Sequence, residues 1–320
     1  MPSDLGYYDL RSPEVRRQQA DLASEAGVKA FANYHYWFNG RQLLEEPVED
    51  ILRSELPEFP FILVWANENW TRRWDGGERK ILMRQYYSLE DDLEHIRALR
   101  PALTSDAYLR RDGKPILAIY RNSLLPASRA TTDLWRAEAE RWGLPGLYLL
   151  CVESAGDQAR DPRPMGFDAA VQFPPSWAEL PKKPDRFLFR RMLRWVDPRF
   201  SHHVLRYDHV AQRSMTMPDP DYPRWPGVTP GFDNTARRRR NATILLDPTP
   251  EAYQRWLEDA LARSERVAQK YEPGLEGLVF VNAWNEWGEG NHLEPDERYG
   301  HGFLQATKQD LTRCSRARDS

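Results

Sequence analysis

The chain of 320 residues is long enough for one large barrel or for two ordinary domains. Its 41% hydrophobic and 29% charged residues are typical of a globular protein, and a formal net charge of −3 gives no sign of a nucleic-acid or anionic-membrane partner. No run of about 18 apolar residues predicts a membrane span, the N-terminus lacks the apolar core of a secretory signal, and the two distant cysteines form no metal-type pair. We therefore expect a cytoplasmic protein without a metal or other cofactor.

Helices and short apolar strands alternate along the chain. The first helix is predicted from Ser12 and Pro13, a cap and a first-turn proline, to Glu25. The other predicted helices cover Leu89–Leu99, Thr132–Trp142, Pro250–Tyr271 and Phe303–Arg313. The predicted strands cover Val28–Tyr36, Phe61–Ala66, Pro115–Tyr120, Leu147–Val152, Asp168–Phe173, a segment near Gly227–Phe232, and Gly277–Ala283. The stretch 174–233 gives little other signal, and the tail from Cys314 is expected to fray.

This order of elements predicts an α/β fold whose parallel sheet is buried on both faces, in a single barrel domain spanning residues 1–320. Seven strands are one fewer than a closed (β/α)₈ TIM barrel has, and the chain opens with a helix, so we expect the first strand of the barrel to be missing. A doubly wound open sheet is the alternative, but no Gly-rich phosphate loop follows an early strand.

Polar and aromatic side chains gather where the predicted strands end, which in a barrel is the face that holds the active site. Tryptophan can stack on the apolar face of a sugar while amides and carboxylates bind its hydroxyl groups. The candidate sugar-binding residues are His35, Tyr36, Trp37, Trp65, Asn67, Glu68, Trp70, Tyr120, Arg121, Asp233, Asn234, Arg237, Asn285, Trp287, His292 and Glu294. For each of them a core, capping or loop-holding role is the alternative, and the run 237–240 of four arginines is more often a solvated loop.

Glu286 and Glu289 directly follow the last predicted strand. Glycosidic cleavage needs two carboxyl groups, one to protonate the leaving oxygen and one to assist at the sugar. Trp284 and Trp287 would provide a partly desolvated setting that raises the pKa of one carboxyl group. Two glutamates at this spacing more often mark an exposed helical face, but their place after a barrel strand makes them the candidate catalytic pair.

Three segments together resemble the WbsX-like family of bacterial polysaccharide-biosynthesis proteins, which is related to the endo-α-mannosidases of glycoside hydrolase family 99. They are YHYWFNGRQLLEEP, FILVWANENWTRRWDGG and NAWNEWGEGNHLEPD. The resemblance covers nearly the whole chain and implies a (β/α)₈ glycosidase barrel. Members of the family usually carry an upstream segment with the first strand, and this chain is expected to begin after it.

The resemblance also implies roles for individual residues. Glu286 matches the carboxylate that deprotonates the substrate 2-hydroxyl, and Glu289 matches the general acid/base of a retaining reaction that passes through a 1,2-anhydro sugar. Gly288 stands where the hydrolases have a histidine, which implies that the substrate contacts differ there.

The leading hypothesis is an enzyme of glycosidase type that acts on a bacterial cell-surface polysaccharide, of the lipopolysaccharide O-antigen or capsule kind, or on its precursor. A glycosyltransferase of polysaccharide biosynthesis and a non-catalytic carbohydrate-binding barrel are the alternatives. The expected partners are an oligosaccharide or polysaccharide substrate and other polysaccharide-assembly enzymes.

Overall fold

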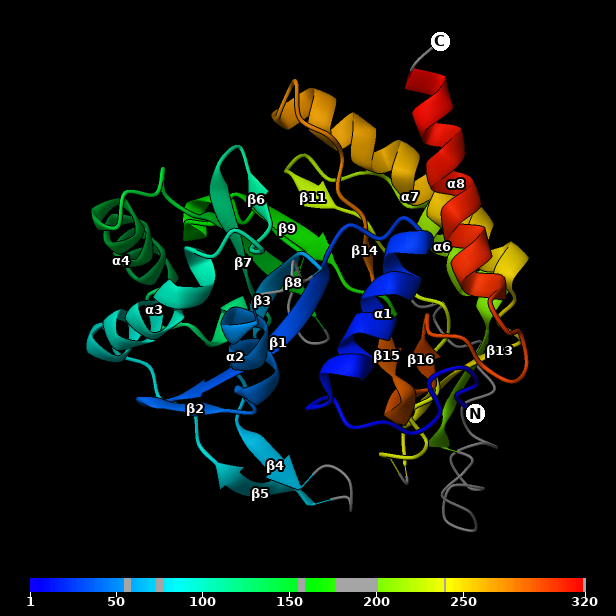
Figure 1. Ribbon diagram of the computed structural model, residues 1–320, viewed down its shortest axis with the longest axis horizontal. Helices are drawn as coiled ribbons and strands as arrows, with labels where there is room; N and C mark the ends of the chain where they lie inside the picture. Colours follow the sequence, from blue (N-terminus) through cyan, green and yellow to red (C-terminus); the bar gives the residue numbers. More distant parts are fainter. Residues whose placement is uncertain (55–58, 73–76, 155–158, 176–200, 239, 319–320) are drawn as a thin grey trace.

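Parallel strands lie side by side in the computed structural model, which describes residues 1–54, 59–72, 77–154, 159–175, 201–238 and 240–318 (Figure 1). The main sheet contains β1 (Phe31–Phe38), β3 (Phe61–Trp65), β7 (Lys114–Ile119), β8 (Tyr148–Glu153), β9 (Ala169–Gln172) and β11 (Arg224–Trp225). Each of these strands is hydrogen-bonded in parallel to the one before it. A doubly wound sheet would reverse its strand order at one point, and this sheet does not.

The segment 224–228 extends the sheet by pairing with a different neighbour at each end. Strand β11 pairs with β9, and β12 (Gly227–Val228) pairs in parallel with β14 (Phe280–Val281). No strand pairing joins β14 to β1 among the described residues. The rings of Phe31 and Trp284 instead approach to 5.1 Å across this interval. The seven predicted barrel strands are thus confirmed, in a TIM-barrel-like arrangement with one interval that side chains bridge.

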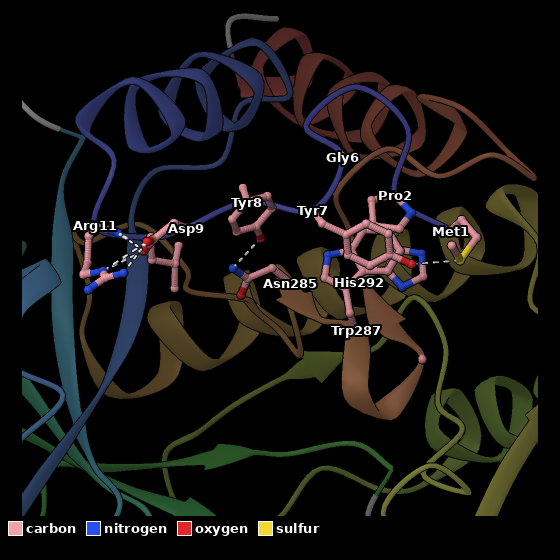
Figure 2. Close-up of a pocket in the computed structure, with 12 residues that line it drawn as sticks. Met1, Pro2, Gly6, Tyr7, Tyr8, Asp9, Arg11, Asn285, Trp287 and His292 are labelled. Atoms are coloured by element: carbon pink, nitrogen blue, oxygen red, sulfur yellow. Dashed lines mark hydrogen bonds and ion pairs between the residues drawn. The ribbon is translucent and has the colours of Figure 1, made fainter.

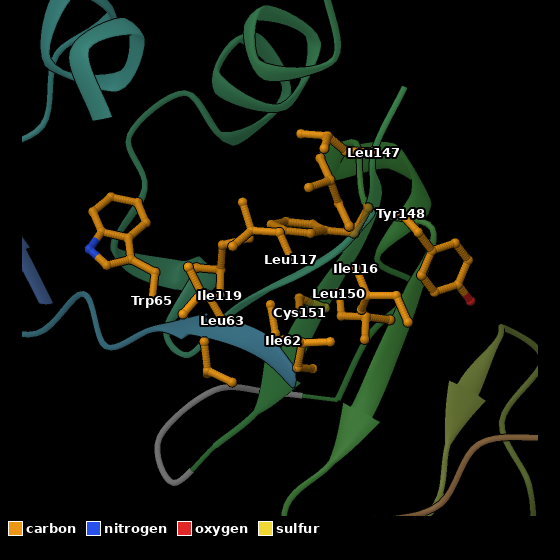
Figure 3. Close-up of a cluster of buried hydrophobic side chains, with 14 of the residues drawn as sticks. Ile62, Leu63, Trp65, Ile116, Leu117, Ile119, Leu147, Tyr148, Leu150 and Cys151 are labelled. Carbon is orange, nitrogen blue, oxygen red and sulfur yellow. The ribbon is translucent and has the colours of Figure 1, made fainter. Parts of the chain in front are cut away.

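Two hydrophobic clusters of buried residues hold the described elements together. One packs the buried strands against α3 (Leu89–Leu103) and α4 (Ser128–Arg141), and Figure 3 shows part of it. Every residue of β8 is buried, as expected for a strand covered on both faces. The other core joins α6 (Tyr207–Thr216), α7 (Pro250–Tyr271) and α8 (Gly302–Arg318), and α1 (Pro13–Glu25) lies against α8.

Local signals explain where most of the helices begin. The side chains of Ser88 and Thr249 cap α3 and α7 by accepting backbone N–H bonds in the first turn. Helix α3 runs past its predicted end through Pro101 to Leu103, which is fully buried, so packing outweighs the proline there. The expectation of a frayed tail was wrong between Cys314 and Arg318, where α8 continues.

The remaining elements are short, and the sequence did not predict them. They are β2 (Arg41–Leu43), α2 (Glu46–Arg53), β4 (Trp70–Arg72), β5 (Gly77–Met83), β6 (Arg110–Arg111), β10 (His203–Arg206), β13 (Thr243–Leu246), β15 (Asn285–Glu286), β16 (Asn291–His292) and three 3₁₀ turns, η2 (Asn122–Leu124), η3 (Arg163–Met165) and η5 (Trp287–Glu289). Part of the poorly predicted stretch 174–233, namely residues 176–200, lies outside the described residues. Within the described ranges, every helix is too short or too polar to cross a membrane.

Candidate active site

The candidate catalytic pair lies in a tight hairpin that follows the last barrel strand. Strands β15 and β16 pair in antiparallel fashion, and the turn η5 between them carries Glu289. Gly290 closes the turn with φ +55°, and a Cβ there would lie 3.2 Å from the Cβ of Asp233. Glycine meets both demands because it tolerates positive φ and has no side chain.

Buried polar groups fix this hairpin to the barrel. The side-chain oxygen of Asn291, which is fully buried, accepts hydrogen bonds from the backbone N–H of Ala283 at 3.0 Å and from the hydroxyl of Thr229 at 2.9 Å. The backbone N–H of Asp233 donates to the carbonyl of Glu289 at 2.6 Å. The hairpin is therefore held at the end of β12 and beside the segment that leads to Arg237.

Arg237 bridges the two glutamates. Its Nη2 lies 2.8 Å from Oε1 of Glu286, and its Nη1 lies 3.4 Å from Oε1 of Glu289. The two carboxylate side chains are 33% and 27% exposed, and that of Arg237 is 48% exposed. One guanidinium thus brings both acids to the same place while solvent still reaches them.

The surroundings shift the proton affinity of Glu286. Burial raises the pKa of its carboxyl group, and the neighbouring charge of Glu289 adds to the rise. The Arg237 guanidinium acts in the opposite direction, because a nearby cation favours the ionised carboxylate. Glu286 is therefore a carboxyl group whose ionisation depends on Arg237.

Gly288 leaves the space that the Arg237 guanidinium occupies. A Cβ at this position would lie 3.1 Å from Nη2 and 3.2 Å from Nε of Arg237, and 3.3 Å from Oε1 of Glu286. Those separations are tighter than ordinary van der Waals contacts, so a side chain at position 288 would force the arginine to shift by a few tenths of an ångström.

Two tyrosines of β1, Tyr34 and Tyr36, lie near the same pair of acids. Burial and the negative charge of Glu286 raise the pKa of both Tyr34 and Tyr36, and Glu289 also contributes at Tyr34. The Tyr34 ring lies 6.0 Å from that of Tyr120, and the Tyr36 ring lies 5.2 Å from that of Trp70. Tyr34 was not among the predicted sugar-binding residues, although side chains alternate along a strand and Tyr34 therefore lies on the same face as Tyr36.

A second charged pair follows β3 and β7. Arg121 Nη1 lies 2.6 Å from Oε1 of Glu68, and both side chains are partly buried. The Asn67 side chain joins the two strand ends by accepting from the backbone N–H of Arg121 and donating to its carbonyl, both at 2.8 Å. Glu68 and Arg121 thus lie at the ends of neighbouring barrel strands.

Four of the predicted sugar-binding residues lie in the barrel wall, namely His35, Trp37, Trp65 and Asn67, each at most 5% exposed. His35 shares a 2.9 Å hydrogen bond with His95, and the Trp37 indole donates to Asp91 at 3.0 Å. Trp65 packs on His95 at 4.6 Å. Direct sugar contact remains a prediction for these four residues, and their burial instead indicates a structural role.

Asp233 and Asn234 shape the turn that carries Arg237. The Asp233 carboxylate accepts from the backbone N–H and the hydroxyl of Thr235, at 2.9 and 2.7 Å. The Asn234 side chain, 6% exposed, accepts from the backbone N–H of Thr243 at 2.8 Å. The backbone carbonyl of Asn234 accepts from the backbone N–H of Arg237 at 3.1 Å. These bonds fix the backbone from which Arg237 extends.

The back of the hairpin faces the N-terminal segment across a cleft of about 1010 Å³ (Figure 2). Asn285, Trp287 and His292 line one wall, and residues of the segment 1–11 line the other. The rings of Trp287 and His292 stack at 3.7 Å, and His292 Nε2 lies 3.0 Å from the carboxylate of Asp296. Glu294, 3% exposed, lies beneath this wall and does not line the cleft.

Within the part of the chain that the structure describes, His, Cys, Asp and Glu side chains form no group of three or more placed to hold a metal ion.

Nearly the whole chain matches one known protein family. Residues 1–307 match the family described as glycosyltransferase WbsX. The chain belongs to the WbsX family. This assignment confirms the resemblance found in the three motifs and places the chain in a family of carbohydrate-active enzymes.

Curated relatives of this WbsX-family chain are longer proteins. It is 42% identical over 314 residues to WxcX, described as an uncharacterized protein, from two strains of Xanthomonas campestris pv. campestris. That alignment covers 98% of the chain and 44% of each relative, so the chain spans less than half the length of the curated relatives it matches.

Solved structures with the same fold include glycosidases. A glycoside hydrolase-like protein superposes with a TM-score of 0.62 at 16% identity, over 97% of this chain and 88% of the other. The GH99 endo-alpha-mannosidase from Bacteroides thetaiotaomicron superposes with a TM-score of 0.61 at 15% identity, over 100% and 84%. These likenesses confirm the TIM-barrel-type glycosidase fold of the WbsX-family chain.

Proposed function

We propose that this WbsX-family chain cleaves glycosidic bonds of a bacterial cell-surface polysaccharide or its precursor, with retention of configuration, using Glu286 and Glu289. Residues 1–320 would act as one catalytic unit in this proposal. The observation that carries it is the shared contact of both carboxylates with Arg237, at the mouth of a glycosidase-type barrel. Paired carboxyl groups are what glycosidic cleavage requires.

The proposed reaction assigns one proton transfer to each acid. Ionised Glu286 takes the proton of the sugar 2-hydroxyl while that oxygen attacks the anomeric carbon. Glu289 gives its proton to the departing glycosidic oxygen, so that a 1,2-anhydro sugar and a free alcohol form. Water then opens the anhydro ring with Glu289 accepting its proton and Glu286 returning one to the 2-oxygen, which restores both acids. Two inversions at the anomeric carbon give overall retention.

The Arg237 guanidinium supports the base role of Glu286, because it opposes the burial that raises the pKa of this carboxyl group. Glu286 must be ionised to act as the base, and the Arg237 guanidinium 2.8 Å away favours that form. Tyr34 and Tyr36 of β1 carry neutral hydroxyl groups near the two glutamates. These hydroxyl groups can donate and accept hydrogen bonds, so they are suited to contact the hydroxyl groups of a bound sugar.

The proposal is tested with Glu286→Gln and Glu289→Gln, which keep the shape of each side chain and remove its proton-transfer ability. Each should lower kcat by about 10²-fold or more, the usual scale of a general acid–base group. The assay follows reducing ends released from a panel of O-antigen and capsule oligosaccharides without a nucleotide-sugar donor. Glu297→Gln, at an exposed position on the same segment, is the matched control and should keep wild-type kcat. Wild-type turnover in either of the first two variants would contradict the assignment.

A glycosyltransferase reaction is the second candidate, because the matching family is described as a glycosyltransferase. The same assay separates the two reactions. A transferase would join sugars only when an activated donor is supplied, whereas a glycosidase releases reducing ends from the polysaccharide alone. A chain that retains oligosaccharide but does neither would be a binding barrel.

A further inference from the structure

Glu294 is a buried acid that takes no part in the proposed reaction. It is 3% exposed, and three different donors satisfy its carboxylate. The hydroxyl of Tyr8 lies 2.9 Å from both of its oxygens, the Gln19 amide donates at 2.7 Å, and the Trp287 indole N–H donates at 2.7 Å. A carboxylate so enclosed has no exposed surface left for a substrate, so its role must be exerted through its neighbours.

The same network reaches the other side of the candidate base. The side-chain amide of Asn285 donates to the Tyr8 hydroxyl at 2.9 Å (Figure 2). Asn285 and Trp287 are the two residues that flank Glu286, and both are held by this network. Asn285 and Glu286 are consecutive residues of β15, so their side chains point to opposite sides of the strand. With Asn285 and the following Trp287 held on the N-terminal segment, the Glu286 side chain extends toward Arg237.

The electrostatics of the network favour a rigid connection. Burial raises the pKa of Glu294, while the hydrogen bonds from Trp287, Gln19 and Tyr8 act to lower it by stabilising the carboxylate. Hydrogen bonds to an ionised carboxylate are shorter and stronger than those between neutral groups. Loss of one donor therefore leaves a buried charge less well satisfied and loosens the hairpin side chain that shares it.

We propose that Tyr8, Gln19 and Glu294 are positioning residues, which hold Asn285 and Trp287 so that the Glu286 carboxylate meets Arg237 and the substrate. This inference rests on the proposed glycosidase function. It assigns to the N-terminal segment, more than 270 residues away in sequence, a part in orienting the catalytic base.

The neighbouring tyrosines provide a matched test. Tyr8→Phe removes the hydroxyl that links Glu294 to Asn285, whereas Tyr7→Phe removes the hydroxyl of a side chain that is 81% exposed and contacts only the Met1 sulfur among the bonds described. Tyr8→Phe should lower kcat about tenfold and change KM less than twofold, because one charged hydrogen bond is lost and the sugar-binding side chains stay in place. Tyr7→Phe should leave both constants at their wild-type values.

Two further readouts separate positioning from simple loss of stability. In Tyr8→Phe the acid limb of kcat/KM should move to higher pH, because a Glu286 that drifts from Arg237 loses the cation that keeps it ionised. Hydrogen exchange of residues 284–293, followed by mass spectrometry, should speed up in Tyr8→Phe while exchange in α3 stays unchanged. Gln19→Met, on α1, removes another donor to Glu294 and serves as the second variant if Tyr8→Phe fails to fold. It should change kcat, the acid limb and the exchange rate of residues 284–293 in the same directions as Tyr8→Phe.

The outcomes distinguish the two proposals. If the wild-type protein releases no sugar from any polysaccharide, the proposed function fails and this inference fails with it. If the wild type is active and folded Tyr8→Phe and Gln19→Met keep its kcat, acid limb and hairpin exchange rates, the positioning role alone is overturned.

Discussion

At the scale of single residues, one arginine determines how the two glutamates behave. Arg237 contacts both carboxylates, and its guanidinium packs closely against position 288, which carries no side chain. All four residues stood out in the sequence, but in separate roles. Glu286 and Glu289 were the candidate catalytic pair, Arg237 was a candidate sugar-binding residue, and Gly288 was a difference from the related hydrolases. Their joint arrangement could not be predicted, because nothing in the sequence places residue 237 against residue 288.

Removal of this cation should change the pH dependence of the reaction. In Arg237→Met the pKa of Glu286 rises further, because burial and Glu289 still raise it and only the backbone hydrogen bond from Gly288 still opposes them. The base is active only when ionised, so activity is lost as pH falls through its pKa, and the acid limb of kcat/KM should move to higher pH. At neutral pH we expect kcat/KM to fall about tenfold or more, the scale of a lost charged hydrogen bond.

The matched control for this experiment is Arg238→Met, which removes the same charge one residue further along the chain. It should leave the acid limb where the wild type has it. An unchanged acid limb in Arg237→Met, or an equal shift in both variants, would show that Arg237 does not control the ionisation of Glu286.

At the scale of elements, strand β1 has two different faces. Tyr34 and Tyr36 lie toward the acid pair, while His35 and Trp37 are buried against α3, where each forms a hydrogen bond. Residues 34–38 are nearly all aromatic, so their composition does not show which face of the strand lies toward the acid pair. His35, Tyr36 and Trp37 were therefore all expected to bind sugar, and Tyr34 was not. The buried partners His95 and Asp91 lie about 55 to 60 residues further on, so only the fold could identify them.

The buried histidine gives a stability prediction. Burial lowers the pKa of His35 to about 4, below its ordinary value of 6.5, so the folded state binds fewer protons than the unfolded state between those pH values. The stability that this neutral imidazole contributes is present above pH 6.5 and is lost as pH falls toward 4. The difference in unfolding free energy between wild type and His35→Gln should therefore shrink by about 2 kcal/mol from pH 7 to pH 5. Urea unfolding at the two pH values measures it, and an equal difference at both would contradict the assignment.

Element prediction succeeded where apolar runs were continuous and failed where segments were short. Strands such as β3 and β8 are buried on both faces, so their composition alone marks them. The hairpins β4–β5 and β15–β16 are polar and depend on contacts with distant segments. The last barrel strand, predicted over Gly277–Ala283, is reduced to Phe280–Val281 because its described partner β12 offers only two residues.

At the scale of the whole molecule, the barrel brings together groups from both ends of the chain. Chain order and strand count predicted the TIM-barrel-like sheet, because parallel strands joined by helices have few ways to pack. They could not predict the contacts of Tyr8 and Gln19 with Glu294, which tie the first 25 residues to the hairpin after the last strand. We expect the active site to depend on this closure as much as on the two acids themselves.

The most direct measurement is ¹H NMR of an O-antigen or capsule oligosaccharide during its first minutes with the wild-type protein, Glu286→Gln or Glu289→Gln, without any activated donor. The account predicts that the wild type forms a new reducing end with the anomeric configuration of the cleaved bond, and that both variants form it at least about 10²-fold more slowly. An inverted product, release that requires a donor, or a wild-type rate in either variant would contradict it.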